Sequence, residues 1–257
     1  MEKVLITGCS SGFGYQTALL LDKNKFDVTA TTRRQGFVFE NTTIKHLYLD
    51  MQHLPESFED YDIVIFNAGI LDAGLAELME DKKIDEMMEV NVTSIMKMCK
   101  KIIPTMKAKK KGKLIFISSM AARRPLPNLA VYNASKAAIE AYAKSLYLEL
   151  SYYGIDVYLI EPGYYPTSLW DDVKENTDEY SKILNSFGKN KKKFRDVKEV
   201  SFQILKICEG KYHILHSTFG ITNKLVVLCK PFIYTKMGKS IYKSILFKFQ
   251  NMKTQNK

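Results

Sequence analysis

Short apolar runs that alternate with helical stretches constrain the fold of this chain more than any other feature. Most of these runs are mainly apolar along their length, whereas a strand with one solvated face would alternate apolar and polar residues. The stretches between them space their apolar residues as an amphipathic helix does. The expected strands span residues 3–7, 27–32, 44–50, 62–69, 113–119 and 156–163, and long helices are expected at 84–109 and 132–152.

Strands that alternate with helices are typical of a parallel sheet, because parallel neighbours need a crossover connection that is usually helical. We therefore expect an α/β fold, a Rossmann-like doubly wound parallel sheet of about seven strands with helices on both faces. With 257 residues, 46% of them apolar, the chain can bury the core of one large domain. We place this domain at residues 1–230 and interpret the long polar stretch 164–195 as a substrate lid.

The chain lacks the signals of a secreted, membrane-spanning or metal-binding protein. It has neither a charged N-terminal segment followed by a long apolar run nor an uncharged apolar stretch of about eighteen residues. The four histidines and four cysteines have no spacing typical of metal ligands or of a disulfide framework. We therefore predict a cytoplasmic protein with reduced, buried thiols and no metal site.

A glycine-rich segment, TGCSSGFG, follows the first expected strand and opens the first helix. Glycine permits a tight turn close to a pyrophosphate, and a helix N-terminus offers free N–H groups to an anion. Three glycines in a loop are weak evidence alone, but their place after the first strand of an α/β pattern favours a dinucleotide site. The predicted cofactor-binding residues of this segment are Gly8, Ser10, Ser11, Gly12, Phe13 and Gly14.

The end of the second expected strand distinguishes the two nicotinamide cofactors. NAD sites usually carry a carboxylate there, which binds the ribose hydroxyls. This strand instead ends in Thr31-Thr32-Arg33-Arg34, so two guanidinium groups are available to pair with a 2′-phosphate. The sequence predicts NADP(H) as the cofactor, with NAD(H) as the less favoured alternative. For Arg34, capping of a solvated loop is a second interpretation.

Residues 131–146 combine a tyrosine, a lysine four positions later and several alanines in one expected helix. Residues four apart share a helix face, so Tyr132 and Lys136 point the same way. The unperturbed pKa of tyrosine, about 10, is too high for acid–base work at neutral pH, and we expect the nearby ammonium to lower it. Tyr132 is therefore a candidate to exchange a proton with a carbonyl or an alcohol.

Six short motifs occur in the order and roughly the spacing of the short-chain dehydrogenase/reductase family. The chain resembles the compact single-domain branch of that family over about residues 3–170. The motifs are TGCSSGFG (7–14), NAG (67–69), NVTS (91–94), ISS (117–119), YNASK (132–136) and PGYYPT (162–167). The resemblance implies a nicotinamide-dependent oxidoreductase that forms a homodimer or homotetramer through its long helices.

The resemblance also implies the role of each catalytic residue. Ser119 would bind and orient the substrate oxygen, and Tyr132 would act as the general acid or base. Lys136 would hold the nicotinamide ribose and tune the tyrosine, while Asn91 would hold a water in the proton relay. By the same resemblance, the remaining cofactor-binding residues are Asp50, Met51, Asn67, Ala68, Gly69, Pro162, Gly163 and Thr167.

Some positions depart from the family pattern without touching these catalytic residues. Phe13, Phe66 and Ala122 stand where other residues are usual, which would change the shape of the pocket. Arg123 and Arg124 follow Ser119 closely. We interpret them as a solvated loop face, with contact to an acidic substrate as the alternative.

The basic charge is concentrated at the C-terminus. The net charge is +10, and residues 210–257 contain nine lysines and no acidic residue. Within residues 231–257, apolar side chains fall on one side of an expected helix and lysines on the other, which suits peripheral contact with an anionic membrane. Packing of this apolar stripe on the protein or on a second subunit is an equal alternative. No nucleic-acid partner is expected, because the segment has no recognisable reading motif.

These features predict an NADP(H)-dependent oxidoreductase that interconverts a ketone or aldehyde and an alcohol by hydride transfer. The aromatic and aliphatic residues at 164–170 favour a lipophilic substrate such as a steroid, a retinoid or an acyl ketone. Two other functions remain open. One is a catalytically silent protein that senses NAD(P). The other is a sugar-nucleotide epimerase or dehydratase on the same fold, which usually has a longer chain.

Overall fold

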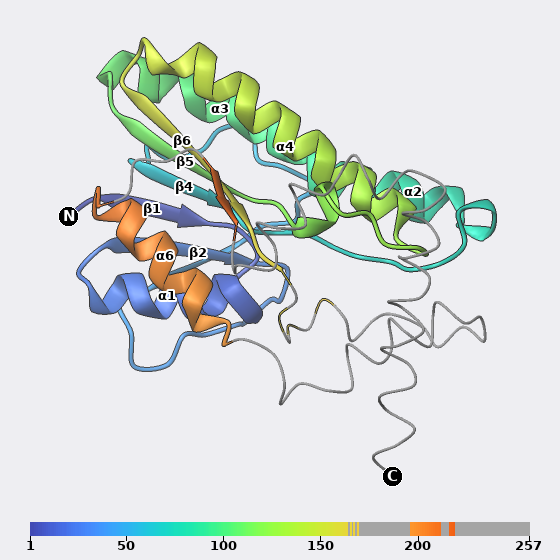
Figure 1. Ribbon diagram of the computed structural model, residues 1–257. Coiled ribbons are helices and arrows are strands. Elements are labelled where there is room, and N and C mark those ends of the chain that lie inside the picture. The colour runs from blue at the N-terminus through green and yellow to red at the C-terminus, as the bar shows by residue number, and fades with distance from the viewer. Residues whose placement is uncertain (164, 166, 168, 170–195, 212–215, 219–257) are drawn as a thin grey trace.

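A parallel seven-stranded sheet forms the centre of the protein in a computed structural model (Figure 1). The structure describes residues 1–163, 165, 167, 169, 196–211 and 216–218. Neighbouring strands follow the order β3-β2-β1-β4-β5-β6-β7, and every pair is parallel. The strands are β1 (Lys3–Ile6), β2 (Asp27–Thr32), β3 (Lys45–Tyr48), β4 (Ile63–Phe66), β5 (Gly112–Ile117), β6 (Ile155–Glu161) and β7 (His216–Thr218).

Helices cover both faces of the sheet, as the alternation of elements predicts. One face carries α1 (Gly12–Lys23) and α6 (Lys198–Cys208), which pack against each other. The opposite face carries α3 (Ser94–Lys109) and α4 (Ala130–Ser151), with the shorter α2 (Asp81–Met88) extending beyond the sheet (Figure 1). The predicted doubly wound α/β architecture is confirmed.

Two apolar layers hold the helices on the sheet, and successive residues of each central strand contribute to opposite layers. In β1, Leu5 belongs to the layer under α3 and α4, whereas Val4 and Ile6 belong to the layer over α1 and α6. The strands β4, β5 and β6 divide their side chains in the same way. Because both faces of the central strands β1, β4, β5 and β6 are buried, these strands are mainly apolar, which explains the apolar runs in the sequence.

The helix expected over 84–109 is longer and less regular than predicted. The helical path begins at Asp81 and is interrupted by a π-helical turn at Glu89–Thr93 before α3 continues to Lys109. A π turn inserts one extra residue into an α-helix and often marks a functional position. Here it carries Asn91, which is fully buried.

The order of the strands reverses direction between β1 and β4, where the two halves of the sheet are wound in opposite senses. Crevices at the carboxyl ends of strands at such a switch point are the usual ligand sites of open α/β sheets. Of the predicted lid, only residues 165, 167 and 169 are described, and the predicted amphipathic segment 231–257 lies outside the described residues. Among the helices that are described, none is long and apolar enough to cross a bilayer.

Candidate active site

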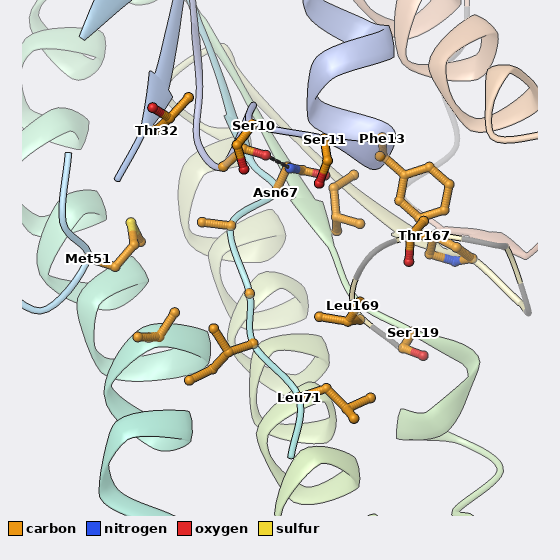
Figure 2. Close-up of a pocket in the computed structure, with 18 of the residues that line it drawn as sticks. Ser10, Ser11, Phe13, Thr32, Met51, Asn67, Leu71, Ser119, Thr167 and Leu169 are labelled. Carbon is orange, nitrogen blue, oxygen red and sulfur yellow. Dashed lines mark hydrogen bonds between the residues drawn. The ribbon is translucent and has the colours of Figure 1, made fainter. Parts of the chain in front are cut away.

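A cavity of about 560 Å³ lies at this switch point, within the usual range of ligand sites. Figure 2 shows Thr32 and Met51 toward one end and Leu71, Ser119 and Leu169 toward the other. The sequence-predicted site residues that line it are Gly8, Ser10, Ser11, Gly12, Phe13, Arg33, Arg34, Met51, Asn67, Ala68, Gly69, Ser119, Tyr132, Lys136, Pro162, Gly163 and Thr167.

Three predicted site residues do not line this cavity. Gly14 lies beneath the loop, and Asn91 is buried behind the cavity wall. The Asp50 carboxylate closes a local turn, where it accepts a hydrogen bond from the Gln52 N–H at 3.0 Å and contacts His53 at 3.2 Å. These bonds lower the pKa of Asp50 although partial burial opposes them. The structure therefore assigns the edge of the cavity to Met51 rather than to Asp50.

The glycine loop fits a bound pyrophosphate. Gly8 and Gly12 have φ angles of +72° and +59°, in the left-handed region that side chains disfavour. A Cβ on Gly8 would lie 2.7 Å from the Ala68 Cα, so only glycine lets the loop after β1 and the loop after β4 approach each other here. No acidic residue occupies the first turn of α1, which leaves the positive end of the helix dipole available to an anion.

Gly14 sets how closely α1 packs on the loop that precedes it. A Cβ at this position would lie 2.4 Å from the Gly8 carbonyl oxygen and 2.5 Å from the Asn67 Nδ2. We expect Gly14→Ala to destabilise the fold by about 1–3 kcal/mol because of overpacking, although the same change usually stabilises a helix by about 1 kcal/mol. Urea denaturation and NADPH titration check this prediction.

The matched control for Gly14→Ala is Gly74→Ala, where the new Cβ would meet only the Met79 Cε at 3.8 Å. This variant should unfold at nearly the urea concentration of the wild type and bind NADPH as tightly. A Gly14→Ala protein with the stability of the wild type would contradict the tight contact between α1 and the loop.

Thr7 and Asn67 lock the loop after β1 to the loop after β4. The Thr7 Oγ1 accepts hydrogen bonds from the N–H groups of Asn67 (3.0 Å) and Ala68 (2.9 Å). In return, the Asn67 Nδ2 donates to the carbonyls of Thr7 and Gly8, both at 2.9 Å. Sequence analysis missed Thr7, although its place between a buried strand and the first glycine was a usable signal.

The catalytic candidates meet at the other end of the cavity. The Tyr132 hydroxyl hydrogen-bonds with the Ser119 hydroxyl, and the Lys136 Nζ lies 5.7 Å from the centre of the Tyr132 ring. Lys136 also donates to the Ile117 carbonyl at 3.2 Å. Ser119 comes from the end of β5, and the other two residues come from one face of α4, as their spacing predicts.

Burial controls the protonation of both groups in the described site. It raises the pKa of Tyr132 to about 12, while the hydrogen bond with Ser119 opposes the rise. It also lowers the pKa of Lys136 to about 8. The pKa of Tyr132 therefore rises instead of falling as the sequence predicted, because desolvation disfavours the charged form of each group. At neutral pH the phenol is protonated and suited to donate a proton.

Asn91 joins the π turn to two neighbouring segments. Its Nδ2 donates to the Ile70 carbonyl at 2.9 Å and to the Ser135 Oγ at 3.0 Å, and its Oδ1 accepts from the Ile70 N–H at 2.8 Å. Ser135 then donates to the Tyr132 carbonyl at 2.8 Å. These bonds place Asn91 behind Tyr132 and Lys136, and they identify Ser135 as a site residue that sequence analysis missed.

Arg123 is not part of a solvated loop face, and it does not line the described cavity. Its side chain is only 17% exposed and forms ion pairs with Glu140 at 3.0 Å and Glu161 at 2.8 Å. The sequence interpretation was wrong here because the two acidic partners lie on α4 and β6, far along the chain.

Comparison with known proteins agrees with the motifs. The family model described as short chain dehydrogenase matches residues 2–178. The 3-ketodihydrosphingosine reductase of Bacteroides thetaiotaomicron is 31% identical over 194 residues, which cover 72% of this chain and 72% of that protein. The 3-oxoacyl-(acyl-carrier-protein) reductase of Buchnera aphidicola from Acyrthosiphon pisum is 27% identical over 240 residues, which cover 86% and 97%.

Solved structures share the fold at lower sequence identity. A short-chain dehydrogenase from Streptomyces avermitilis has a TM-score of 0.75 at 19% identity, with 100% of this chain and 98% of that chain covered. A 3-ketoacyl-(acyl-carrier-protein) reductase from Brucella melitensis, complexed with NADH, has a TM-score of 0.70 at 24% identity, with 84% and 93% covered. A short-chain dehydrogenase from Sphingobium yanoikuyae, in complex with NADPH, has a TM-score of 0.69 at 20% identity, with 89% and 92% covered.

The family model spans the whole region that contains the glycine loop, Ser119, Tyr132 and Lys136, and a relative above 30% identity spans nearly three quarters of the chain. The sheet order and the solved structures agree with this assignment. On these grounds, the chain belongs to the short-chain dehydrogenase/reductase family of oxidoreductases.

Proposed function

We propose that this protein is an NADP(H)-dependent oxidoreductase that interconverts a ketone or aldehyde and an alcohol. The observation that carries the proposal is the convergence of Ser119, Tyr132 and Lys136 on one cavity that also contains the glycine loop. The cofactor, when bound, supplies or accepts the hydride. The described residues would bind it along the cavity from Met51 to Thr167.

The protein's own part in the reaction is to orient the carbonyl and to move a proton. The Ser119 hydroxyl would donate a hydrogen bond to the substrate oxygen, and the Tyr132 hydroxyl would donate the proton as the alcohol forms. Burial keeps this phenol protonated at neutral pH, so the hydroxyl can donate a proton to the substrate oxygen. Lys136 would bind the nicotinamide ribose and hold a positive charge near the phenol.

The preference for NADP(H) is supported by the charge at the end of β2. Arg33 and Arg34 line the cavity, and the Arg34 N–H donates to the Thr32 Oγ1 at 3.1 Å. The described contact of Arg33 with Glu86 is 4.0 Å long between side chains that are 53% and 36% exposed. Such a surface pair is weak, so Arg33 can turn toward a 2′-phosphate and bind it through charge-assisted hydrogen bonds.

Replacing both arginines by alanine should raise the Kd for NADPH by about 10–100-fold, as expected for the loss of one or two charge-assisted hydrogen bonds. The Kd for NADH should change by less than about threefold. Fluorescence titration with each cofactor measures both constants. Lys45→Ala, which removes a surface cation paired with Asp27 outside the cavity, is the control. Equal weakening of NADPH and NADH binding would contradict the assigned 2′-phosphate site.

A lipophilic substrate is supported by the wall around Tyr132. This tyrosine packs in an apolar cluster with Leu71, Ala121 and Leu129, and partly buried Ile70 and Leu169 lie against it. The names of two relatives denote ketone substrates, a 3-ketodihydrosphingosine in one and a 3-oxoacyl group on acyl carrier protein in the other. We therefore propose an acyl-type ketone or a comparably apolar carbonyl compound as the substrate.

The proposed activity is tested by NADPH oxidation against a panel of ketones and aldehydes of increasing chain length. Turnover that rises with the length of the apolar chain supports the proposal. Tight NADPH binding without turnover of any carbonyl compound in the panel would instead favour a sensor of the cofactor.

Assembly through α3 and α4 is proposed as well. On α4, the small residues Ala134, Ala137 and Ala141 are exposed, and Leu148 is 73% exposed. An exposed strip of small and apolar residues supports close packing against a second copy in a homodimer or homotetramer.

A further inference from the structure

We propose that Arg123 is a positioning residue, which fixes the turn carrying Ser119 against the helix carrying Tyr132 and Lys136 and against the end of β6. The proposal rests on the proposed function, since it assigns Ser119 the task of orienting the substrate oxygen. Arg123 does not line the described cavity, and it therefore acts on the reaction through other groups.

The guanidinium group joins three separate elements. Its Nε lies 2.8 Å from the Glu161 Oε1, at the end of β6, and its terminal nitrogen Nη2 lies 3.0 Å from the Glu140 Oε1, on α4. Arg123 itself ends the 3₁₀ turn Met120–Ala122, which begins directly after Ser119. The Arg123 side chain thus connects the turn that follows Ser119 to the helix that carries Tyr132 and Lys136 and to the end of β6.

The bonds of the turn carry this restraint to Ser119. The Arg123 N–H donates to the Met120 carbonyl at 3.1 Å, and the Met120 N–H donates to the Pro162 carbonyl at 3.0 Å. The Ser119 Oγ accepts from the Ala121 N–H at 3.1 Å. A shift of Arg123 would move the turn, and with it the hydroxyl that meets Tyr132.

Both partners of Arg123 lie close in the chain to residues of the active site. Glu140 lies one helical turn after Lys136 and two turns after Tyr132 on the same face of α4. Glu161 directly precedes Pro162, which lines the cavity. The two ion pairs of Arg123 with Glu140 and Glu161 (the clamp) therefore fix the position of the Ser119 turn relative to the helix that carries Tyr132 and Lys136 and to the end of β6.

Burial makes the clamp rigid and specific for arginine. The Glu161 side chain is 0% exposed and that of Glu140 is 13% exposed, so their carboxylates need a cation nearby. A planar guanidinium group can bind two carboxylates at fixed angles, whereas a lysine ammonium is a single point charge on a flexible chain. Lys144 also pairs with Glu140, but it joins residues of α4 only.

Arg123→Lys keeps the positive charge but removes the planar group that binds both carboxylates at fixed angles. With NADPH and ethyl acetoacetate as probes, we expect kcat to fall by about 10–100-fold, because displacement by about 1 Å can cost that much. The KM for NADPH should stay within about twofold. Lys144→Met, which removes a second cation that pairs with Glu140 without touching the Ser119 turn, should leave kcat within about twofold.

A double-mutant cycle with Ser119→Ala separates positioning from general damage to the fold. If Arg123 acts through Ser119, then Arg123→Lys should lower kcat by less than about threefold when Ser119 is already alanine. An equal loss in both backgrounds, or no loss in either, would overturn the proposal. Should Arg123→Lys fail to fold, Glu140→Gln takes its place, because it removes one charged contact while keeping the side-chain shape.

A crystal structure of the Arg123→Lys variant gives a readout that needs no substrate. We expect the hydrogen bond between the Ser119 and Tyr132 hydroxyls to be broken, and an unmoved Ser119 would overturn the proposal. If the wild type reduces no carbonyl compound, the proposed function fails, and this structural comparison still decides the role of Arg123.

Discussion

Tyr132→Phe should lower kcat for carbonyl reduction by about 10²–10⁴-fold, the usual contribution of a positioned general acid. The change removes only the hydroxyl that hydrogen-bonds with Ser119, and the phenylalanine ring fits the same apolar cluster with Leu71 and Leu129. The Kd for NADPH should therefore change little. Steady-state NADPH oxidation and fluorescence titration measure the two quantities.

The control for Tyr132→Phe is Tyr147→Phe on the same helix, where the side chain is 40% exposed and no loss of activity is expected. A Tyr132→Phe protein that reduces carbonyl compounds at the wild-type rate would contradict the role of this phenol as the acid. If it instead retains a biological output that depends on NADPH, while the wild type has no turnover, the protein is a cofactor sensor.

Lys136→Met should inactivate the enzyme while stabilising the fold without cofactor. Burial lowers the pKa of Lys136 from 10.5 to about 8, and each unit of pKa shift corresponds to about 1.4 kcal/mol. Methionine avoids this cost of about 3 kcal/mol but leaves the Ile117 carbonyl without its hydrogen bond, a loss of about 1 kcal/mol. We expect a net gain of about 1–3 kcal/mol at pH 7 and a fall of about 10²–10³-fold in kcat.

The stability difference should depend on pH in a defined direction. Below pH 8 the lysine is protonated in both the folded and the unfolded chain, so the destabilisation by the buried ammonium is fully present. As the pH rises from about 8 toward 10.5, the folded state releases the proton first, and the destabilisation disappears. The advantage of Lys136→Met over the wild type should therefore be lost over this range.

Urea denaturation without cofactor, at pH values on both sides of this range, measures the effect of Lys136. Lys100→Met is the control, because Lys100 is an exposed residue of α3 and its substitution should not alter the pH dependence. A Lys136→Met protein that is less stable than the wild type at pH 7 would show that the ammonium stabilises the folded state and would contradict its unfavourable burial.

Local sequence predicted the parts of this protein that depend on neighbouring residues. Continuous apolar runs gave the central strands, because a strand buried on both faces has no polar position. The glycines of the loop after β1 predicted a tight turn, and the four-residue spacing of Tyr132 and Lys136 predicted a shared helix face. Both predictions could be made from sequence because a turn and a helix face are set by short-range geometry.

Tertiary structure decided the remaining features, because each depends on residues that are distant in sequence. The π turn at Asn91 is held by hydrogen bonds to Ile70 and to Ser135 of α4. The spacing of apolar residues along the helix does not indicate these distant partners. Met51 rather than Asp50 reaches the cavity because the Asp50 carboxylate closes its own turn.

Charge and protonation were the least predictable from sequence. Arg123 looks like a loop residue until α4 and β6 bring Glu140 and Glu161 to it. The pKa of Tyr132 rises although a lysine lies one helical turn away, because desolvation acts on both groups and depends on everything packed around them. The sequence by itself determined which groups could carry the chemistry. The tertiary structure decided their protonation and the contacts that hold them in place, because both depend on burial by distant parts of the chain.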